Sequence, residues 1–314
     1  MKNKKIVVTG GAGFIGSNIA RKLAKDNQIT ILDNFTTGRR KNIDDLVANG
    51  VSLIKDDIRN ISMLKRIFKG ADYVFHQAAI ASVPLSIQDP ILANEVNLTG
   101  TLNVLVAARD NNVGRVVFAS SCAVYGDDPT PKKAETIIPK PLSPYAVTKM
   151  IGEHYCRVFH EIYGLSAVSL RYFNVYGPYQ DPKSDYAAAI PKFIEKLQRD
   201  KPPTIYGDGR QTRDFVFVED VVAANISAAE KKSIDGQIIN IASGKDTTIN
   251  AIVTKLIKLF KSGVKPVYEE ERKGEIKYSL ADITKAGKLL GYEPKFNLES
   301  GLKKTVEYFN AASR

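Results

Sequence analysis

Two residues near the middle of the chain, Tyr145 and Lys149, have the types and spacing of a proton-transfer pair. They lie four residues apart in SPYAVTK, which places both on one helix face, about 6 Å apart along the axis. Free tyrosine is a poor base because its pKa is about 10, but a neighbouring ammonium favours the phenolate. A YxxxK pair is common by chance and usually marks a surface contact. Ser120 and Ser121 follow the apolar run VVFA, and one of their hydroxyls could hold a reacting oxygen.

A glycine-rich turn lies near the start of the chain. The segment GGAGFIG, residues 10–16, has the spacing GxxGxxG between an apolar run, Lys5–Thr9, and a helical pattern, Phe14–Lys25. One glycine allows a positive φ, a second lets a pyrophosphate approach the backbone, and a third allows close packing of helix and strand. The glycines alone are a weak signal, but strand, turn and helix together predict a dinucleotide site. The expected cofactor contacts in this turn are Gly10, Gly13, Phe14, Ile15 and Gly16.

An acid, Asp33, closes the second apolar run, Gln28–Leu32, 17 residues after Gly16. A carboxylate at this point accepts hydrogen bonds from the adenosine ribose and repels a 2′-phosphate, so it favours NAD over NADP. Arg39 and Arg40 nearby argue mildly for NADP, and a turn residue is the alternative role for Asp33. The sequence therefore predicts NAD as the cofactor.

The elements that must hold these residues alternate between apolar strands and amphipathic helices. This alternation predicts βαβ units and a parallel, doubly wound α/β sheet with both faces covered. We expect a Rossmann NAD(P)-binding domain over residues 1–174 and about 214–242, and a smaller α/β C-terminal lobe for the substrate over 175–213 and 243–314. The expected main-sheet strands are Lys5–Thr9, Gln28–Leu32, Val51–Lys55, Tyr73–Gln77, Val116–Ser120, Ser166–Arg171, Phe215–Val218 and Gln237–Ile241. The expected helices include Pro90–Asn111, Tyr145–Tyr163, Ala251–Phe260 and Glu299–Phe309.

The composition is that of an ordinary globular protein, except for a net charge of +11 from 45 basic and 34 acidic residues. The basic residues are spread along the chain without a nucleic-acid-binding motif, so we expect no nucleic-acid partner. A phosphate-bearing small substrate and surface solubility remain as explanations. No apolar run reaches the about 18–20 residues that cross a membrane, and no signal peptide is evident, which predicts a cytoplasmic protein. Cys122, Cys156 and three histidines lack metal-ligand spacing, so no metal is expected.

Motifs along the whole chain match one family. They are TGGAGFIGSN (9–18), LDNF (32–35), DDI (56–58), HQAA (76–79), SSCAVYG (120–126), SPYAVTK (143–149), RYFNVYGP (171–178), YGDGRQTRDFVFVED (206–220) and SLADITKA (279–286). On these motifs the chain resembles the extended short-chain dehydrogenases/reductases, and within them the UDP-hexose 4-epimerases. The phrases PLSPYAVTK, YAAAIPKF and SLADITKAGKLLGY look most like the UDP-N-acetylglucosamine 4-epimerases.

The resemblance implies a tightly bound NAD that is reduced and reoxidised within one turnover. By this resemblance Tyr145 takes the proton from the sugar 4-hydroxyl while hydride passes from C4 to NAD⁺. The 4-keto sugar then turns over and receives the hydride on its other face. Ser121 is the implied hydroxyl partner, and Lys149 holds the nicotinamide ribose.

The resemblance also implies contacts and assembly. Besides the glycine turn, the implied cofactor contacts are Asp33, Asn34, Gly38, Asp57, Ile58, Gln77, Tyr145, Lys149 and Val175. The implied contacts to a UDP-sugar are Ser82, Ser121, Tyr145, Asn174, Arg213, Arg272 and Ser279. A homodimer held by the helices Pro90–Asn111 and Tyr145–Tyr163 is implied as well. The alternatives are a turn residue for Asn174 and solvated surface side chains for Arg213 and Arg272.

Four positions bear on the reaction and the sugar. Dehydratase and decarboxylase relatives carry an acid where Cys122 and Ala123 stand, and its absence favours simple epimerisation. Ser279 stands where family members restricted to UDP-glucose and UDP-galactose have a tyrosine, and a small residue there leaves room for a 2-acetamido group. UDP-N-acetylglucosamine 4-epimerases often have an arginine in place of Leu85, which leaves the preference open.

Three functions therefore stay open. The first is a UDP-N-acetylhexosamine 4-epimerase that interconverts UDP-GlcNAc and UDP-GalNAc. The second is a UDP-glucose/UDP-galactose 4-epimerase that accepts both sugar types. The third is a non-catalytic NAD-binding regulatory protein, against which the intact Ser121, Tyr145 and Lys149 argue.

Overall fold

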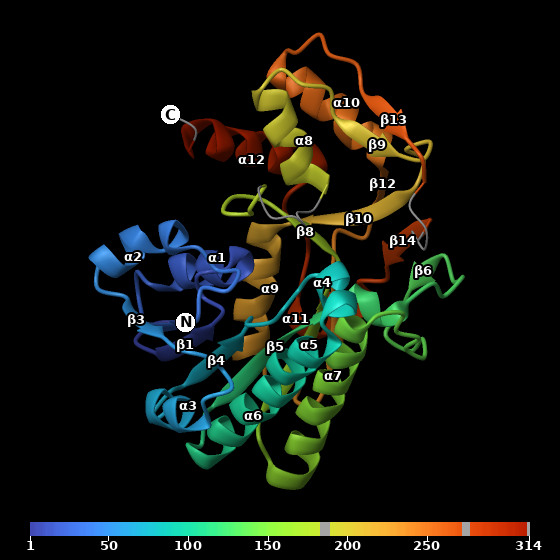
Figure 1. The fold of residues 1–314 in the computed structure, drawn as a ribbon. Coiled ribbons are helices and arrows are strands. Elements are labelled where there is room, and N and C mark those ends of the chain that lie inside the picture. The colour runs from blue at the N-terminus through green and yellow to red at the C-terminus, as the bar shows by residue number, and fades with distance from the viewer. Residues whose placement is uncertain (183–188, 272–276, 313–314) are drawn as a thin grey trace.

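The structure is a computed structural model that describes residues 1–182, 189–271 and 277–312. Its centre is a seven-stranded sheet in the order β11-β7-β5-β4-β1-β2-β3, in which every neighbouring pair is parallel (Figure 1). The strands are β1 (Lys5–Thr9), β2 (Gln28–Asp33), β3 (Ser52–Lys55), β4 (Tyr73–His76), β5 (Arg115–Ser121), β7 (Ala167–Tyr172) and β11 (Ile238–Ile241). The predicted doubly wound α/β fold is confirmed.

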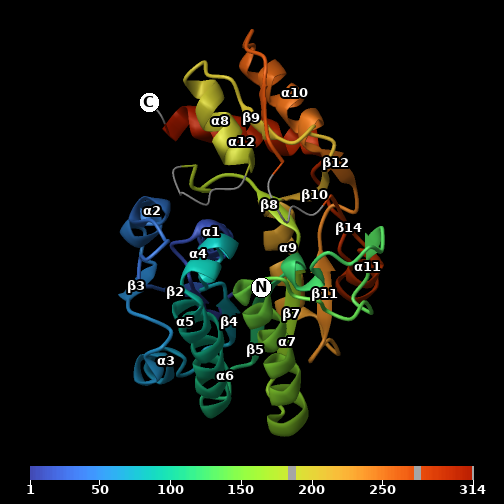
Figure 2. The ribbon, with the colours of Figure 1, turned by 45° about the vertical axis from the view of Figure 1, so that its right-hand side comes forward.

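Helices cover both faces of this sheet because successive apolar side chains of a strand point to opposite sides. Ile6 and Val8 of β1 lie in one core with residues of α1 (Phe14–Leu23) and α9 (Val218–Glu230). Val7 lies in the other core with residues of α3 (Ile61–Ile67), α6 (Gly100–Asp110) and α7 (Pro144–Tyr163). Figure 2 shows α6 and α7 side by side against the sheet. The shorter helical elements around the sheet are η1 (Arg40–Asn42), α2 (Asp44–Ala48), α4 (Val83–Gln88), α5 (Pro90–Asn94), η2 (Glu95–Thr99), η3 (Cys122–Tyr125) and α11 (Thr284–Leu290).

The predicted helix Pro90–Asn111 is a single run made of α5, the π-helical turn η2 and α6. By length and composition alone, Pro90–Asp110 could cross a membrane. Half of its most apolar window is buried inside the fold, where the run contacts α3 and α7. The length and composition of this run are therefore weak evidence for a membrane span.

A second lobe is built around a smaller sheet in the order β12-β10-β14-β6, with β8 paired to β10. The prediction that Phe215–Val218 joins the main sheet was wrong. Phe215 pairs with Asn174 in the second sheet, and Val218 begins α9. An apolar run predicts a strand but carries no information about which sheet the strand joins. The elements of this lobe are β6 (Lys132–Lys133), β8 (Asn174–Tyr176), α8 (Ala189–Gln198), β9 (Thr204–Tyr206), β10 (Thr212–Phe217), β12 (Asp246–Thr248), α10 (Ile249–Phe260), β13 (Val267–Glu269), β14 (Tyr278–Ala281) and α12 (Leu298–Ala312).

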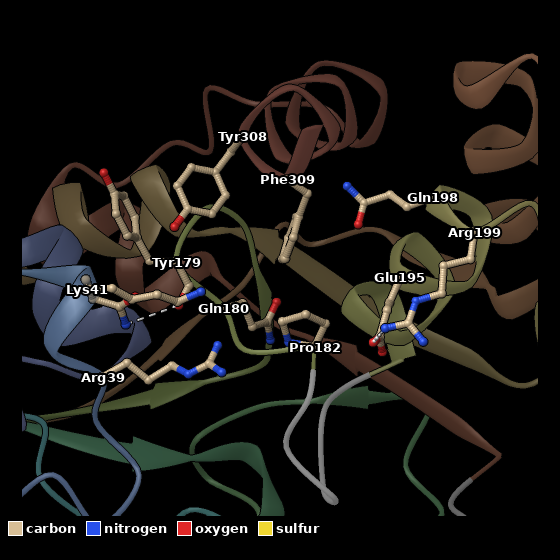
Figure 3. A pocket seen from close by; sticks show the side chains of 11 residues that line it. Arg39, Lys41, Tyr179, Gln180, Pro182, Glu195, Gln198, Arg199, Tyr308 and Phe309 are labelled. Atoms are coloured by element: carbon tan, nitrogen blue, oxygen red, sulfur yellow. Dashed lines mark hydrogen bonds and ion pairs between the residues drawn. The ribbon is translucent and has the colours of Figure 1, made fainter. Parts of the chain in front are cut away.

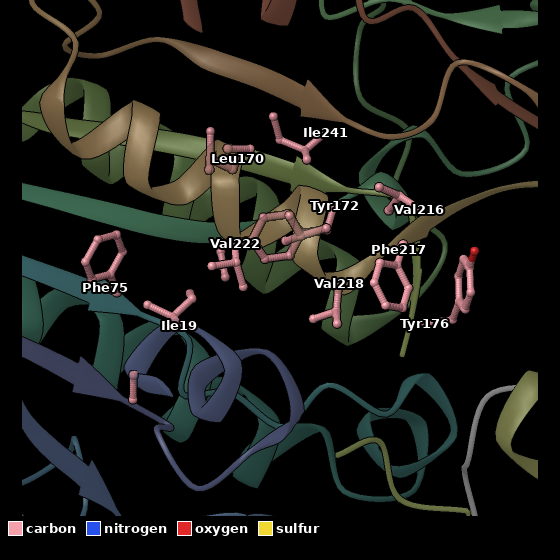
Figure 4. Packing of buried hydrophobic residues seen from close by; sticks show 14 of the residues in the cluster. Ile19, Phe75, Leu170, Tyr172, Tyr176, Val216, Phe217, Val218, Val222 and Ile241 are labelled. Carbon is pink, nitrogen blue, oxygen red and sulfur yellow. The ribbon is translucent and has the colours of Figure 1, made fainter. Parts of the chain in front are cut away.

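One apolar core runs through both lobes. Ile19 of α1, Leu170 of β7 and Val222 of α9 lie in the same cluster as Tyr176 and Phe217, which come from strands of the second sheet (Figure 4). The same cluster continues into α8, α10 and α12. The two lobes therefore share buried surface, and this fixes the second sheet above the carboxyl ends of β5 and β7.

Candidate active site

The glycine turn has no room for a side chain at two of its glycines. Gly10 has a φ of +67°, and a Cβ added there would lie 2.6 Å from the backbone nitrogen of Ala78. A Cβ added at Gly16 would lie 2.2 Å from the carbonyl oxygen of Gly10. Helix α1 begins after Gly13, and no side chain caps its first turn. The free N–H groups at this helix end suit a pyrophosphate.

Asp33 lies at the end of β2 and holds the loops around the turn. Its carboxylate accepts hydrogen bonds from the N–H groups of Ala12 and Phe35, at 2.9 and 2.8 Å. A Cβ on Gly38 would lie 2.5 Å from this carboxylate. Burial raises the pKa of Asp33 although both hydrogen bonds oppose the shift. Asp33 therefore has the structural role of a turn residue, and its carboxylate lies beside Gly38.

Four of the other predicted cofactor residues, Asn34, Asp57, Ile58 and Gln77, follow the carboxyl ends of β2, β3 and β4. Asn34 donates a hydrogen bond to Asp57 at 2.8 Å, and Ile58 lies so close to Gly100 that a Cβ there would meet it at 2.5 Å. Gln77, directly after β4, donates to the hydroxyl of Tyr172 at 3.2 Å. Val175 lies farther along, on β8.

Ser121, Tyr145 and Lys149 meet at the carboxyl end of β5. Ser121 is the last residue of that strand, and its hydroxyl accepts a hydrogen bond from the N–H of Ala123 at 3.2 Å and lies near enough to Tyr145 to influence the pKa of the phenol. Lys149, 4% exposed, lies one helical turn after Tyr145 and donates to the carbonyl oxygen of Ala119 at 2.8 Å. Its Nζ lies 5.9 Å from the centre of the Tyr145 ring. The fold therefore brings Ser121 together with the Tyr145–Lys149 pair, which lies 24 residues farther along the chain.

Burial dominates the acid–base properties of this cluster. It raises the pKa of Tyr145 to about 12, and the Ser121 hydroxyl opposes this shift only in part. Burial also lowers the pKa of Lys149 to about 8. That the Lys149 ammonium, together with a cationic nicotinamide, favours the phenolate of Tyr145 therefore stays a prediction. A further positive charge beside the ring is needed to lower the pKa of Tyr145.

Three of the predicted substrate residues lie on the second sheet. Arg213 of β10 is the direct neighbour of Ser279 of β14, and both are half-buried. Asn174 of β8 donates to the carbonyl oxygen of Asp214 at 3.3 Å. Ser82 caps α4, where its hydroxyl accepts from the N–H of Leu85 at 3.1 Å. Arg272 lies outside the described residues.

Cys122, the position where an acid would support other reactions, follows Ser121 directly. Burial raises the pKa of its thiol to about 12, while the charge of Arg213 opposes the shift. The thiol is therefore neutral near pH 7 and supplies no general acid or base. Cys122 begins the short helical turn η3, directly after β5.

Two further residues, Asn97 and Ser86, are not distinguished by any sequence pattern. Asn97, on the π-helical turn η2, donates to the carbonyl oxygen of Ile80 at 3.0 Å and to the hydroxyl of Thr148 at 3.2 Å. Ser86 of α4 accepts from the N–H of Tyr145 at 3.1 Å. Both fix the start of α7. A polar residue inside a helical pattern is ordinarily solvated, so only the fold reveals these contacts.

A cavity of about 370 Å³ lies away from the cluster, between η1, the segment Tyr179–Pro182, α8 and α12 (Figure 3). Arg39 at its wall forms an ion pair with Asp181 at 2.6 Å, and Arg199 forms one with Glu195 at 2.9 Å. The cavity touches none of Ser121, Tyr145 and Lys149. It marks the junction of the two lobes rather than the site of chemistry.

Comparison with known proteins gives the class of this chain. Residues 6–242 match the NAD dependent epimerase/dehydratase family, and the chain belongs to that family. It is an enzyme of this class, and its cofactor is NAD. The glycine turn and the uncapped end of α1 are features that suit such a cofactor.

Three relatives show how far the similarity extends. A UDP-N-acetylglucosamine 4-epimerase from Methanobrevibacter ruminantium, solved with UDP-N-acetylmuramic acid, superposes with a TM-score of 0.96 at 43% identity, covering 99% of this chain and all of that one. A UDP-glucose 4-epimerase from Thermotoga maritima, solved with UDP-glucose, has a TM-score of 0.94 at 39% identity, covering 99% and 100%. A UDP-glucuronate 4-epimerase from Thermodesulfobacterium geofontis is 36% identical, covering 96% of this chain and 95% of that protein. The resemblance inferred from the motifs is confirmed.

Proposed function

We propose that this chain is a UDP-sugar 4-epimerase that interconverts UDP-GlcNAc and UDP-GalNAc with a resident NAD. The observation that carries the proposal is the cluster of the half-buried Ser121 with the buried Tyr145 and Lys149 at the carboxyl end of β5. The similarity to the M. ruminantium enzyme supports the acetylated sugar. The roles expected for the individual site residues, and the division of the chain into a cofactor domain and a substrate lobe, belong to this proposal.

The cluster can move one proton in each direction. NAD would be held at the glycine turn by Gly10, Gly13 and Gly16, where it would supply a reversible acceptor for the hydride of C4 and, while oxidised, a positive charge. Tyr145 accepts the proton of the 4-hydroxyl on its phenolic oxygen, and Ser121 holds the sugar oxygen by a hydrogen bond. Because burial holds the pKa of Tyr145 at about 12, the phenolate forms only when positive charge lies beside it. Proton removal is thereby tied to the oxidised state of the cofactor.

The second sheet supplies the reason for the acetylated sugar. Ser279 lies beside Arg213, so a diphosphate bound to Arg213 brings the sugar toward the Ser279 position. A serine there leaves a volume that a tyrosine would fill. UDP-glucose is the second candidate substrate, since the T. maritima relative was solved with it at 39% identity.

We also propose that the protein is a cytoplasmic homodimer without nucleic-acid or membrane partners. The support for the dimer is a row of exposed apolar side chains on neighbouring helices, namely Ile87 of α4, Ile91 of α5 and Val147 of α7. Ile91 is 73% exposed. Sedimentation of the wild type and of Ile91→Asp tests the dimer, because a charge in the interface shifts the protein to the monomer.

The decisive experiment is incubation of the purified protein with UDP-GlcNAc, UDP-glucose and UDP-glucuronate, each without added NAD. Chromatographic separation of the products gives the reaction, and kcat/KM for each sugar gives the preference. We expect UDP-GalNAc from UDP-GlcNAc, with the highest kcat/KM of the three. If the preparation retains NAD and converts none of the three sugars, the epimerase proposal is wrong. The hypothesis of a non-catalytic NAD-binding protein then remains.

A further inference from the structure

A buried ion pair lies next to the catalytic cluster and takes no part in the proposed reaction. Glu153 of α7 and Arg171 of β7 are each 1% exposed. The guanidinium of Arg171 donates to both carboxylate oxygens of Glu153, at 2.7 Å each. Burial lowers the pKa of Arg171, but its bonds to Glu153 outweigh burial and the pKa is raised. Arg171 therefore keeps its charge in the interior of the fold, against the carboxyl group of Glu153.

Glu153 joins the two elements that carry the catalytic residues, α7 and β5, and Arg171 ties it to the neighbouring strand β7. Glu153 lies four residues after Lys149 and eight after Tyr145, so all three lie on the same face of α7. The hydroxyl of Ser120, the residue before Ser121, donates to the same carboxylate. Glu153 thus bonds the catalytic helix directly to the catalytic end of β5.

The pair also reaches the substrate lobe. The guanidinium of Arg171 lies 4.7 Å over the ring of Tyr125. The hydroxyl of Tyr125 donates to Asn240 at 2.8 Å, and Asn240 donates to the carbonyl oxygen of Asp282 at 3.1 Å. Asp282 directly follows β14, the strand that carries Ser279. A continuous set of contacts therefore runs from the catalytic helix to the strand beside the sugar.

Glu153 has no geometry for proton transfer to a substrate. Both of its oxygens accept hydrogen bonds from Arg171, and one also accepts from Ser120. Its side chain has no exposed path to solvent, with 1% exposure. The role left for Glu153 is to fix the position of α7 relative to β5.

We propose that Glu153 and Arg171 are positioning residues that hold Tyr145 and Ser121 at the separation that hydride and proton transfer require. This inference rests on the proposed epimerase function. A buried ion pair suits the task because its two short bidentate bonds fix direction as well as distance. Small misplacement of reacting groups lowers rates by about a hundredfold without loss of binding.

The test is the rate at which a UDP-sugar reduces the bound NAD in a single turnover, followed by absorbance at 340 nm. Glu153→Gln keeps the shape of the side chain and removes its charge. We expect a rate about tenfold to a hundredfold lower than in the wild type. The amplitude, the NAD content and KM should stay within threefold, because a misplaced site still binds both ligands.

Arg115→Gln is the matched control. Arg115 begins the same strand β5, is 8% exposed and forms an ion pair with Asp235 at 3.0 Å. It lies at the end of β5 opposite to Ser121. We expect this variant to lose stability but to reduce NAD at the rate of the wild type. Equal slowing in Arg115→Gln and Glu153→Gln overturns the proposal, because general destabilisation would then explain both.

If Glu153→Gln fails to fold, a double variant distinguishes an effect on the position of the catalytic residues from an effect on the stability of the fold. Glu153→Leu with Arg171→Met leaves no unpaired buried charge, and such replacements often restore stability. We expect a folded protein whose NAD reduction stays slow. Recovery of the wild-type rate together with stability overturns the proposal. If the wild type itself reduces no NAD with any UDP-sugar, the epimerase function fails and this inference falls with it.

Discussion

The cofactor region and the substrate lobe of this molecule differ in whether the backbone or the side chains are restricted. In the cofactor region the backbone has no freedom, since a Cβ at Gly16 would lie 2.2 Å from the Gly10 carbonyl oxygen. In the proposed substrate lobe, Ser279 is half-buried on the four-residue strand β14. On the proposed function, the backbone would hold the cofactor and side chains would select the sugar. This division fits relatives that share this fold and are named for UDP-glucose, UDP-glucuronate and UDP-N-acetylglucosamine.

Loss of the Tyr145 hydroxyl should have the largest effect, because it should stop turnover while NAD stays bound. In Tyr145→Phe we expect kcat to fall by about 10³ or more, because a positioned acid–base group contributes about 10²–10⁴. The NAD content should stay at the wild-type level, since the glycine turn is untouched. Turnover and NAD released on denaturation are the two measurements. Activity within tenfold of the wild type would rule out Tyr145 as the acid–base group.

A single methyl group added to the glycine turn should prevent most NAD binding. Gly16→Ala forces a Cβ against backbone that cannot move aside, and we expect a loss of about 2–3 kcal/mol of stability together with most of the bound NAD. Gly263→Ala is the control, because a Cβ there has nothing within 4 Å. Denaturant unfolding and NAD content measure the effect. If the two alanine variants behave alike, the backbone does not restrict the cofactor site as described.

A large side chain in the substrate lobe should change specificity without touching the cofactor. In Ser279→Tyr we expect kcat/KM for UDP-GlcNAc to fall about tenfold to a hundredfold relative to UDP-glucose. The phenol fills the volume that the acetamido group needs. Kinetics with both sugars and the NAD content measure the outcome. Equal losses on the two sugars would show that Ser279 does not gate the acetamido group.

The smallest expected effect is a gain in stability from removing a catalytic residue. Burial lowers the pKa of Lys149 from 10.5 to about 8, a penalty on the charged form of about 3 kcal/mol. Lys149→Met removes this penalty but also the hydrogen bond to Ala119, so we expect about 1–3 kcal/mol of added stability at pH 7.

The gain in stability of Lys149→Met should depend on pH, and the direction of this dependence follows from the lowered pKa of Lys149. Between about pH 8 and 10.5 the unfolded chain holds the Lys149 proton and the folded chain does not, so the stability of the wild type rises with pH in that window. The advantage of Lys149→Met should therefore be largest below pH 8 and shrink toward pH 10.5. Urea unfolding at pH 7 and pH 10 measures it. An advantage that does not change with pH would contradict burial of a charged Lys149.

The strands and helices around the glycine turn could be predicted from the sequence to within a few residues. Strand β1 is found where the apolar run predicts it, and Asp33 stands at the end of β2 as expected, because strands buried on both faces are short and uniformly apolar. The same reasoning placed β10 in the wrong sheet, since pairing between distant strands leaves no local pattern. Glu153 was missed because an acid on a helix ordinarily faces water. Its spacing of four from Lys149 was the only available signal.

The core that runs from α1 through α9 into the second lobe has a consequence for making new enzymes from this one. Because Val222 and Phe217 share one cluster, the lobes are not exchangeable modules, and a chimaera that joins this cofactor half to the substrate half of a relative would break that cluster along its length. New sugar preferences have to be installed by single substitutions on β10 and β14, within an otherwise intact chain.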